Sequence, residues 1–380
     1  MTLNKTASLL LIIAASATFL YVAKPLLVPF VIALLIWYLI NAFSHWIGHF
    51  AIVRKHFPVW THVLISSLFI LMVLLTLGGL IVENARNMVN AGPVYQKNLG
   101  DVISHLDDAL PLDLSAVKSA VDSNLFVEFG KLIETTDFTI AGIVQRILNT
   151  LSGIAANAFL ILIYLVFLFF EQVQFSKKAR ALFSGGDQDF KFFEVIDHIN
   201  EAIRAYFKVK ITVSLITATA SYLLMVWIGL EFAIFWAFLI FLLNFIPNIG
   251  SLIATLFPSA LALIQFPDSF YPFLVVLIGV GAIQVIVGNL IEPRMMGSSL
   301  NISSLVVILS LSLWGTMWGI TGMILCVPIT VIMMIIFAQF PSTRPVAILL
   351  SENGELMTDL KVIHEAYEEN EDEEEIGNKE

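Results

Sequence analysis

Residues 232–267 read FAIFWAFLIFLLNFIPNIGSLIATLFPSALALIQFP, a block of 36 residues without one charged side chain. As one straight helix this block would be about 54 Å long, whereas the hydrocarbon core of a bilayer is about 30 Å thick. Pro247 has no backbone N–H and disfavours helix at the preceding residue, and Gly250 lets the chain turn. The block therefore predicts a helical hairpin that breaks at 245–250 inside the membrane.

A second uncharged block, residues 295–343, is 49 residues long and predicts another hairpin. It would be roughly 74 Å long as one helix, and it contains the glycine-rich turn WGTMWGITG at 314–322. In both blocks a glycine is followed by an apolar half-helix and a proline. With the orientation that the basic loops predict (below), the two hairpins enter the membrane from opposite sides, as paired re-entrant hairpins do in secondary transporters.

The rest of the chain has the composition of a membrane protein. It is 58% hydrophobic and 13% charged, against about 25% charged in ordinary soluble domains. Shorter uncharged blocks are long enough to cross the bilayer or nearly so. They are residues 8–23, 25–44, 59–82, 147–170, 211–230 and 269–291. We predict an all-α, polytopic inner-membrane protein with two broken, re-entrant hairpins and a small helical extramembrane insert.

Basic residues near the span ends predict the orientation. Lys5, the loop 50–58 and the region 171–210 carry them, which places both termini in the cytoplasm and residues 84–146 outside. Lys208 and Lys210 begin a span and are interpreted as snorkelling to the interface. The predicted parts are N-terminal membrane helices (1–83), a periplasmic helical insert (84–146), a membrane helix (147–176), a cytoplasmic amphipathic connector (177–209), a core transport domain (210–343) and an acidic tail (344–380).

Several function classes have no support in the sequence. Nine acids and one lysine in residues 365–380 give that segment a net charge of −8 within a total of −10, so a nucleic-acid partner is not expected. There is no P-loop, HExxH or GxSxG motif, and we predict neither an enzyme nor a cofactor. His45 and His49 have helical spacing but sit at a span end among aromatics, so no metal site is predicted.

Broken helices at membrane depth leave backbone groups that need polar surroundings, and such breaks are common substrate sites. In the first block Asn244 and Asn248 supply amides, although a kink with self-satisfied asparagines is the structural alternative. The segment GNLIEPRMMG at 288–297 has ionisable groups at a span end, which indicates a functional site. The alternative is that Glu292 and Arg294 form an ion pair that anchors the end of the helix. The third segment, 314–328, has GxxxG spacing that also suits simple helix packing.

These three segments and the predicted span 269–291, which contains Gln284, give two sets of candidate residues. The substrate-pathway candidates are Asn244, Pro247, Asn248, Gly250, Ser251, Pro258, Gln284, Asn289, Glu292 and Arg294. The hinge and packing candidates are Gly297, Trp314, Gly315, Gly319, Gly322 and Pro328.

NFIPNIGS at 244–251, GNLIEPRMMG at 288–297 and the WG…G..GM.L.VP pattern at 314–328 resemble, in order and spacing, the autoinducer-2 exporter family of PerM-like permeases. The resemblance covers residues 5–356, and the strongly acidic tail beyond it departs from the family pattern. It implies a bacterial inner-membrane transporter that exports autoinducer-2, a small hydroxylated furanone-type signal of quorum sensing. It also implies a homo-oligomer, with a pentamer as the suggested size.

Three functions remain open at this point. A transporter for a neutral polar solute needs amides and hydroxyls along its path, and Asn244, Asn248, Ser251, Gln284 and Asn289 would supply them. A sodium(lithium)/proton antiporter, the activity described for some family members, needs a titratable carboxylate at mid-membrane, where Glu292 is the acid nearest the motifs. A non-transporting membrane scaffold would have hairpins packed dry by glycine and phenylalanine. Export of a small polar metabolite is the preferred prediction.

Overall fold

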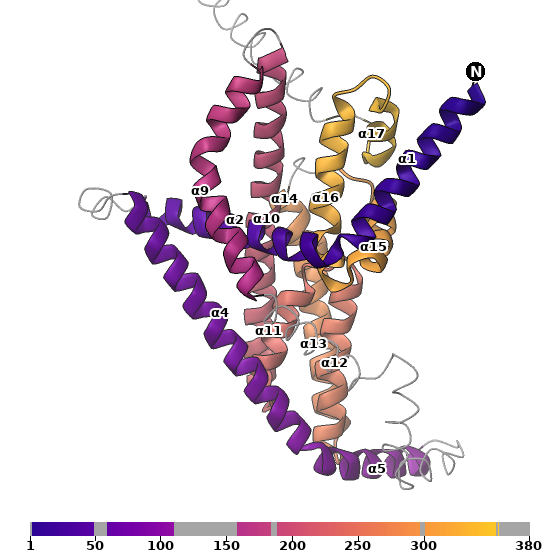
Figure 1. Ribbon diagram of the computed structural model, residues 1–380. Coiled ribbons are helices and arrows are strands. Elements are labelled where there is room, and N and C mark those ends of the chain that lie inside the picture. The colour runs from indigo at the N-terminus through magenta and orange to yellow at the C-terminus, as the bar shows by residue number, and fades with distance from the viewer. Residues whose placement is uncertain are drawn as a thin grey trace, which may run out of the picture. The chain divides into compact units, whose positions relative to one another are not determined.

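The computed structural model of the chain describes residues 2–48, 59–109, 158–183, 188–296, 301–354 and 356. Within these ranges the regular structure is helical, apart from one isolated bridge between Ile302 and Ser351. The helices, coloured along the chain in Figure 1, are α1 (Thr2–Val22), α2 (Lys24–Gly48), α4 (Val59–Asn90), α5 (Gly92–Ala109), α9 (Ala158–Phe183), α10 (Gln188–Ile228), α11 (Ala233–Leu243), α12 (Ile249–Gln265), α13 (Phe270–Ile286), the π-helix η1 (Val287–Ile291), α14 (Glu292–Met296), α15 (Ser304–Trp318), α16 (Ile320–Ala338) and α17 (Arg344–Leu350). The predicted all-α fold is confirmed.

Five described segments are long and apolar enough to cross a membrane: Lys24–Ser44, Thr61–Leu80, Val195–Ile228, Phe270–Met296 and Ile320–Ala338. Large apolar side chains on them face outward, among them Met72 and Leu75 on α4 and Trp227 on α10, each at least 67% exposed. Apolar surface of this extent suits lipid rather than water. The protein is therefore a polytopic membrane protein, as the sequence predicts.

Helix α10 is longer than the sequence analysis expects. The predicted connector 177–209 and the span 211–230 meet at 209/210, yet α10 runs through that position as one helix of 41 residues. At 1.5 Å per residue it is about 62 Å long. Of the predicted span 147–170 only the part from 158 onward lies within the described residues, where it begins α9.

The described helices fall into two units. One comprises residues 1–179, 221–239 and 254–281, and the other comprises 180–220, 240–253 and 282–380. Helices α10, α11, α12 and α13 each run through both.

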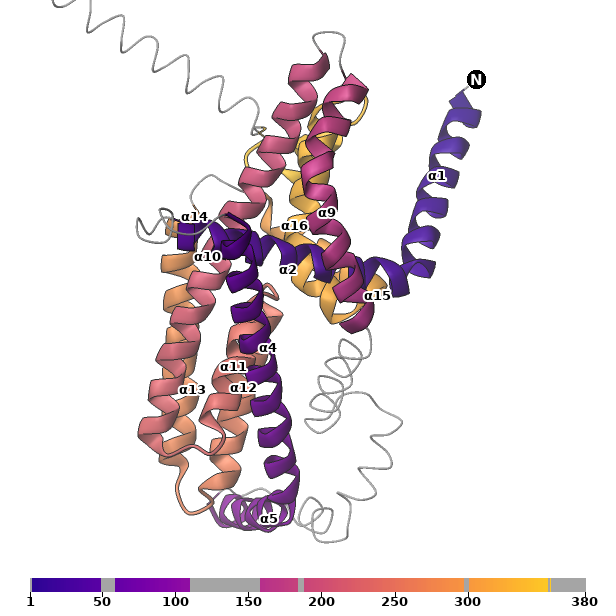
Figure 2. The same cartoon turned by 60° about the vertical axis from the view of Figure 1, so that its left-hand side comes forward.

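In the first unit the block 232–267 doubles back on itself. Its two ends meet, because the backbone N–H of Glu231 donates to Oε1 of Gln265 at 2.8 Å. Farther along, the rings of Trp236 on α11 and Phe257 on α12 pack edge to face at 6.4 Å. Figure 2 shows α11, α12 and α13 running side by side. The predicted first hairpin is confirmed.

Helix α5 is attached to the same end of this hairpin. The Tyr95 hydroxyl donates to Oε2 of Glu231, and Nδ2 of Asn98 donates to the carbonyl oxygen of Ile264 at 3.0 Å. Burial, followed by the hydrogen bond to Glu231, raises the pKa of Tyr95 above its ordinary value. Helix α5 belongs to the predicted insert 84–146, of which residues 110–146 lie outside the described residues.

In the second unit the block 295–343 also folds back. Helices α15 and α16 pack against each other along their length and are separated only by Gly319, whose φ of 65° reverses the chain. After α16 the chain returns through α17, and the backbone N–H of Glu352 donates to the carbonyl oxygen of Asn301 at 3.2 Å. The second predicted hairpin is confirmed, and the segment 347–356 packs on its open end.

Candidate functional site

A line of polar side chains lies along the buried face of α10. Lys210, Ser214 and Thr217 are separated by four and three residues, the spacing that places side chains on one face of a helix. All three are at most 6% exposed, and Tyr206, one turn earlier on the same face, is 2% exposed. Burial of polar side chains in a membrane-spanning helix is costly and marks a functional region.

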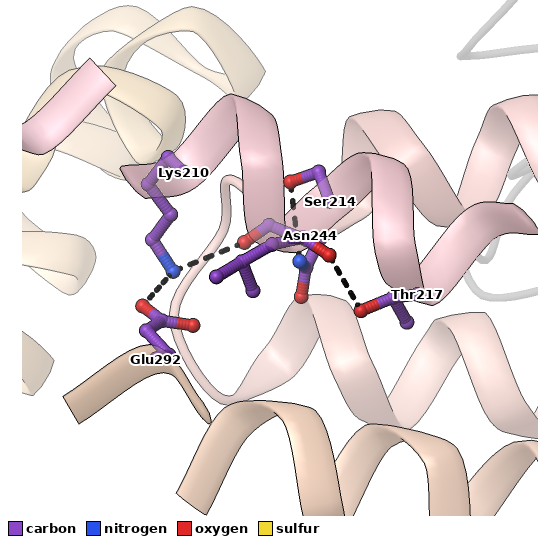
Figure 3. Close-up of polar contacts among 6 residues, drawn as sticks. Lys210, Ser214, Thr217, Asn244 and Glu292 are labelled. Atoms are coloured by element: carbon purple, nitrogen blue, oxygen red, sulfur yellow. Dashed lines mark hydrogen bonds and ion pairs between the residues drawn. The ribbon is translucent and has the colours of Figure 1, made fainter. Parts of the chain in front are cut away.

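Lys210 is the centre of this line. Its ammonium forms an ion pair with Oε1 of Glu292, and the two side chains are only 8% and 18% exposed. It also donates to the backbone carbonyl oxygen of Asn244 at 3.3 Å (Figure 3). The snorkelling interpretation is therefore wrong for Lys210, because its charge is neutralised inside the protein by a carboxylate rather than by water at the interface. Lys208, two residues earlier, is exposed.

Asn244 joins α10 to the break of the first hairpin. It is the first residue after α11, so its carbonyl has lost the helical hydrogen bond that a continuing helix would supply. A cation at a helix C-terminus also interacts favourably with the helix dipole, and Lys210 supplies it. The side-chain amide of Asn244 donates to Oγ of Ser214 at 3.1 Å, and the Thr217 hydroxyl, one turn on, donates to its own helix at Val213.

The break itself is built from three backbone devices. Pro247 interrupts the helix, and Asn248 adopts the left-handed conformation with a φ of 58°. Gly250 is needed for close approach rather than for the turn, since a Cβ there would lie 1.8 Å from the carbonyl oxygen of Leu243. Asn248 is exposed, and its carbonyl accepts a hydrogen bond from the Ser251 hydroxyl at 2.9 Å. The turn that we attribute to Gly250 from sequence is thus made at Asn248.

Glu292 is positioned by a change of helix type. Helix α13 passes into the π-helix η1, and Glu292 is the first residue after it. Val287 of η1 packs against Val209 and Val213 of α10, which holds the two helices together beside Lys210. Single π-helical turns insert an extra residue and are frequent at functional sites. Here Glu292, directly after the π-turn, pairs with Lys210 of α10.

The other residues of this segment are placed differently. Arg294 and Asn289 are exposed, and within the described part of the chain no ion pair joins Arg294 to Glu292. The anchoring ion pair considered from sequence is therefore not formed. Gln284 is 8% exposed, and its Nε2 has no hydrogen-bond partner in the described ranges. Gly297 lies outside the described residues.

The second hairpin contributes α16 to the surroundings of Lys210. Cys326, fully buried on α16, lies within electrostatic range of Lys210 and of Tyr206. One turn later the Thr330 hydroxyl donates to the carbonyl oxygen of Cys326 at 2.6 Å and is hydrogen bonded to Oγ of Ser310 on α15 at 2.9 Å. A buried hydrogen bond thus joins the two arms of the hairpin beside the site.

Glycines bring those arms together. A Cβ at Gly322 would lie 1.9 Å from the carbonyl oxygen of Trp314, and one at Gly315 would lie 3.0 Å from Cε of Met323. The rings of Trp314 and Trp318 are buried and 5.3 Å apart. Pro328 is buried within α16. The geometry of Gly322 is that of a close helix contact.

The structure brings two of the predicted pathway residues together. Asn244 and Glu292 meet at the ammonium of Lys210, whereas Asn248, Asn289 and Arg294 are exposed. Pro258 is buried within α12, in the other unit. The role of these residues in a pathway stays a prediction. No group of three or more metal-ligating side chains occurs in the described ranges.

Sequence reasoning missed Ser214 and Thr217, and it assigned Lys210 and Tyr206 to the membrane interface rather than to a site; both are buried in the structure. The signal was present, because these residues recur at helical spacing on one face of an otherwise apolar span. We read the span by its length and its lack of charge, and a lysine at its start then looked like an ordinary interface anchor.

Comparison with known proteins gives a consistent picture. A profile of the AI-2E family transporters matches residues 10–342. A putative transport protein of Haemophilus influenzae is 32% identical over 340 residues, which cover 87% of this chain and 91% of that protein. The AI-2 transport protein TqsA of Escherichia coli K12 is 29% identical over 337 residues, covering 87% of this chain and 90% of TqsA. The putative transport protein YhhT of the same strain is 27% identical over 352 residues, covering 92% and 93%.

Proposed function

We propose, from the premise that this chain belongs to the AI-2E transporter family, that it is the exporter of a small neutral polar solute, autoinducer-2. The membrane transporter class follows from the family and from the apolar helices. The identity of the cargo and the outward direction are our proposal. One relative, 29% identical, is named an AI-2 transport protein, which supports this cargo. The family and its relatives point away from catalysis.

The observation that carries the proposal is the neutralised polar cluster at the helix break. Lys210 and Glu292 cancel each other's charge, and the amide of Asn244 and the hydroxyl of Ser214 lie beside them. Non-helical backbone at membrane depth persists where it is packed in protein or lines a polar passage. A cluster without net charge favours a neutral solute that exchanges hydrogen bonds, since a passing ion would need an unbalanced charge.

A sodium(lithium)/proton antiporter is the second candidate, and one observation favours it. Glu292 is a carboxylate that is mostly removed from solvent within a candidate span, as an ion-coupling group must be. We rank it second because Lys210 already occupies the carboxylate, and a metal cation would have to displace that ammonium.

We further propose the setting in which transport occurs. The basic loops support an inner-membrane location with both termini in the cytoplasm and residues 84–146 on the outside. The protein is surrounded by the lipid bilayer. We propose that it forms a homo-oligomer, with a pentamer as the suggested size. The core transport domain is 210–343, to which the continuous helix α10 adds residues from 188 onward.

Purified protein in proteoliposomes tests the proposal. We expect autoinducer-2 to move across the membrane without sodium, and sodium to stay in place under an imposed pH gradient. Asn244→Ala should slow this flux because it removes the amide that meets Ser214 while keeping the carbonyl that meets Lys210. Asn41→Ala is the matched control, since that amide only donates to its own helix at Trp37. Sodium movement without autoinducer-2 flux would instead establish the antiporter.

A further inference from the structure

Three hydrogen-bonding positions around the helix break have no protein partner among the described residues. Lys210 carries three N–H bonds, and two of them are directed to Glu292 and to the Asn244 carbonyl. Glu292 uses Oε1 for this pair, and its Oε2 makes no further contact within the described ranges. The third position is the hydroxyl of Tyr206, which is buried and without a partner in the same ranges.

Tyr206 is the most informative of the three. It lies one helical turn before Lys210 on the same face of α10 and is 2% exposed. Buried hydroxyls are nearly always hydrogen bonded, because an unpaired one costs the free energy of its lost hydration. Phenylalanine would fill the same space without that cost. A tyrosine here therefore indicates a ligand that supplies the missing partner.

The chemistry of the three positions defines what would bind. An ammonium N–H is a donor, a carboxylate oxygen is an acceptor, and a phenolic hydroxyl is both. A hydroxyl group of a solute can accept from Lys210 and donate to Glu292, while a neighbouring hydroxyl bonds to Tyr206. A bare cation would instead be repelled by the positively charged ammonium of Lys210. The set matches a neutral solute with adjacent hydroxyl groups.

We propose that Tyr206, Lys210 and Glu292 form the hydroxyl-binding part of the cargo site, with Tyr206 as the residue that distinguishes hydroxylated cargo from its deoxy analogues. This inference rests on the proposed function and names the side chains that recognise the cargo. Val209 and Val213 of α10 pack with Val287 of η1, near Lys210 along the helix, and these apolar side chains offer the cargo no competing hydrogen bonds.

The test compares autoinducer-2 with two analogues, each lacking one of two adjacent hydroxyl groups, in proteoliposome flux. For the wild-type protein we expect at least one analogue to have a KM about fivefold above that of autoinducer-2, the worth of one neutral hydrogen bond. In Tyr206→Phe this ratio should fall to about one, because the phenolic hydroxyl that distinguishes the two compounds is gone. Tyr222→Phe, the same replacement on the same helix outside the cluster, should keep the wild-type ratio.

The ratio of two KM values in one variant cancels any general loss of folding or activity. Equal KM values for all three compounds in the wild type, or an unchanged ratio in Tyr206→Phe, would overturn the hydroxyl-binding site while leaving autoinducer-2 export intact. Absence of autoinducer-2 flux in the wild type would overturn the proposed function and this inference together. Because the wild-type comparison needs no variant, a Tyr206→Phe protein that fails to fold still leaves the site testable.

Discussion

Replacing Glu292 with glutamine keeps the size of the side chain but removes the negative charge that faces Lys210. The ammonium, 8% exposed, would then be left without a counter-charge. Removing one partner of a buried ion pair typically costs about 3–5 kcal/mol, because the remaining charge stays desolvated. For a chain of this size, a loss of that magnitude lowers the melting temperature by roughly 4 to 6 °C.

The chain contains its own reporter for this measurement. Cys326 is the single cysteine of the sequence and is fully buried. A fluorogenic maleimide added to the detergent-solubilised protein therefore reacts when the helices around α16 open. Heating wild-type and Glu292→Gln protein with the dye gives the two melting temperatures directly, without any assumption about the cargo.

Two controls separate charge from packing. Glu171→Gln breaks the surface pair with Lys178, whose side chains are 49% and 64% exposed, and should change stability by less than about 1 kcal/mol. Lys210→Met combined with Glu292→Leu removes both charges and should restore stability to near the wild-type level or above it. The reasoning is refuted if Glu292→Gln has the same melting temperature as Glu171→Gln. It is also refuted if the melting temperature of the double variant is as low as that of Glu292→Gln alone.

Three further predictions concern the two hairpins and α5. Asn248→Leu should abolish flux, whereas Asn248→Gly should retain it if transport needs the left-handed turn, where the φ of Asn248 is 58°. Measuring the flux of both variants in proteoliposomes distinguishes a role of the backbone turn from a role of the side-chain amide. Gly322→Ala should lower the melting temperature by several degrees because its Cβ would lie 1.9 Å from a carbonyl oxygen of α15, while Gly288→Ala, with open space around it, should not. The raised pKa of Tyr95 means that its hydrogen bond to Glu231 stabilises the fold fully below the ordinary tyrosine pKa of about 10 and is progressively lost as pH rises above it. Protection of the α5 amides, measured relative to their base-catalysed intrinsic exchange rates, should therefore fall at high pH, and in Tyr95→Phe it should already be low at neutral pH with no further fall of this kind.

The hairpins were predictable because they follow from length and charge alone. A block of 36 uncharged residues with Pro247 in its interior has no way to remain one helix within a bilayer. The close packing of the second hairpin was likewise anticipated as an alternative, since the GxxxG of Gly315 and Gly319, continued by Gly322, is read directly from the sequence.

The centre of the site was not predictable in the same way. Which face of α10 turns inward depends on packing against helices far along the chain, and Lys210 and Glu292 lie on different helices. A lysine at the start of a span ordinarily reaches the interface. Glu292 follows a π-helical turn directly, and such a turn shifts the register of the residues after it in a way that the sequence does not reveal. The spans were found by their lack of charge, and this criterion does not detect polar residues that recur at helical spacing within a span.

The length of α10 has a mechanical consequence. A rod of about 62 Å is twice as long as hydrocarbon is thick, so roughly half of it stands clear of the lipid even when it is upright. Lys210 lies near its middle, about 33 Å from the end at Gln188. Pivoting the rod by 10° about Lys210 would swing that end through about 6 Å. A paramagnetic or fluorescent label at Gln188 would thus amplify a tilt at Lys210 that is too small to follow directly.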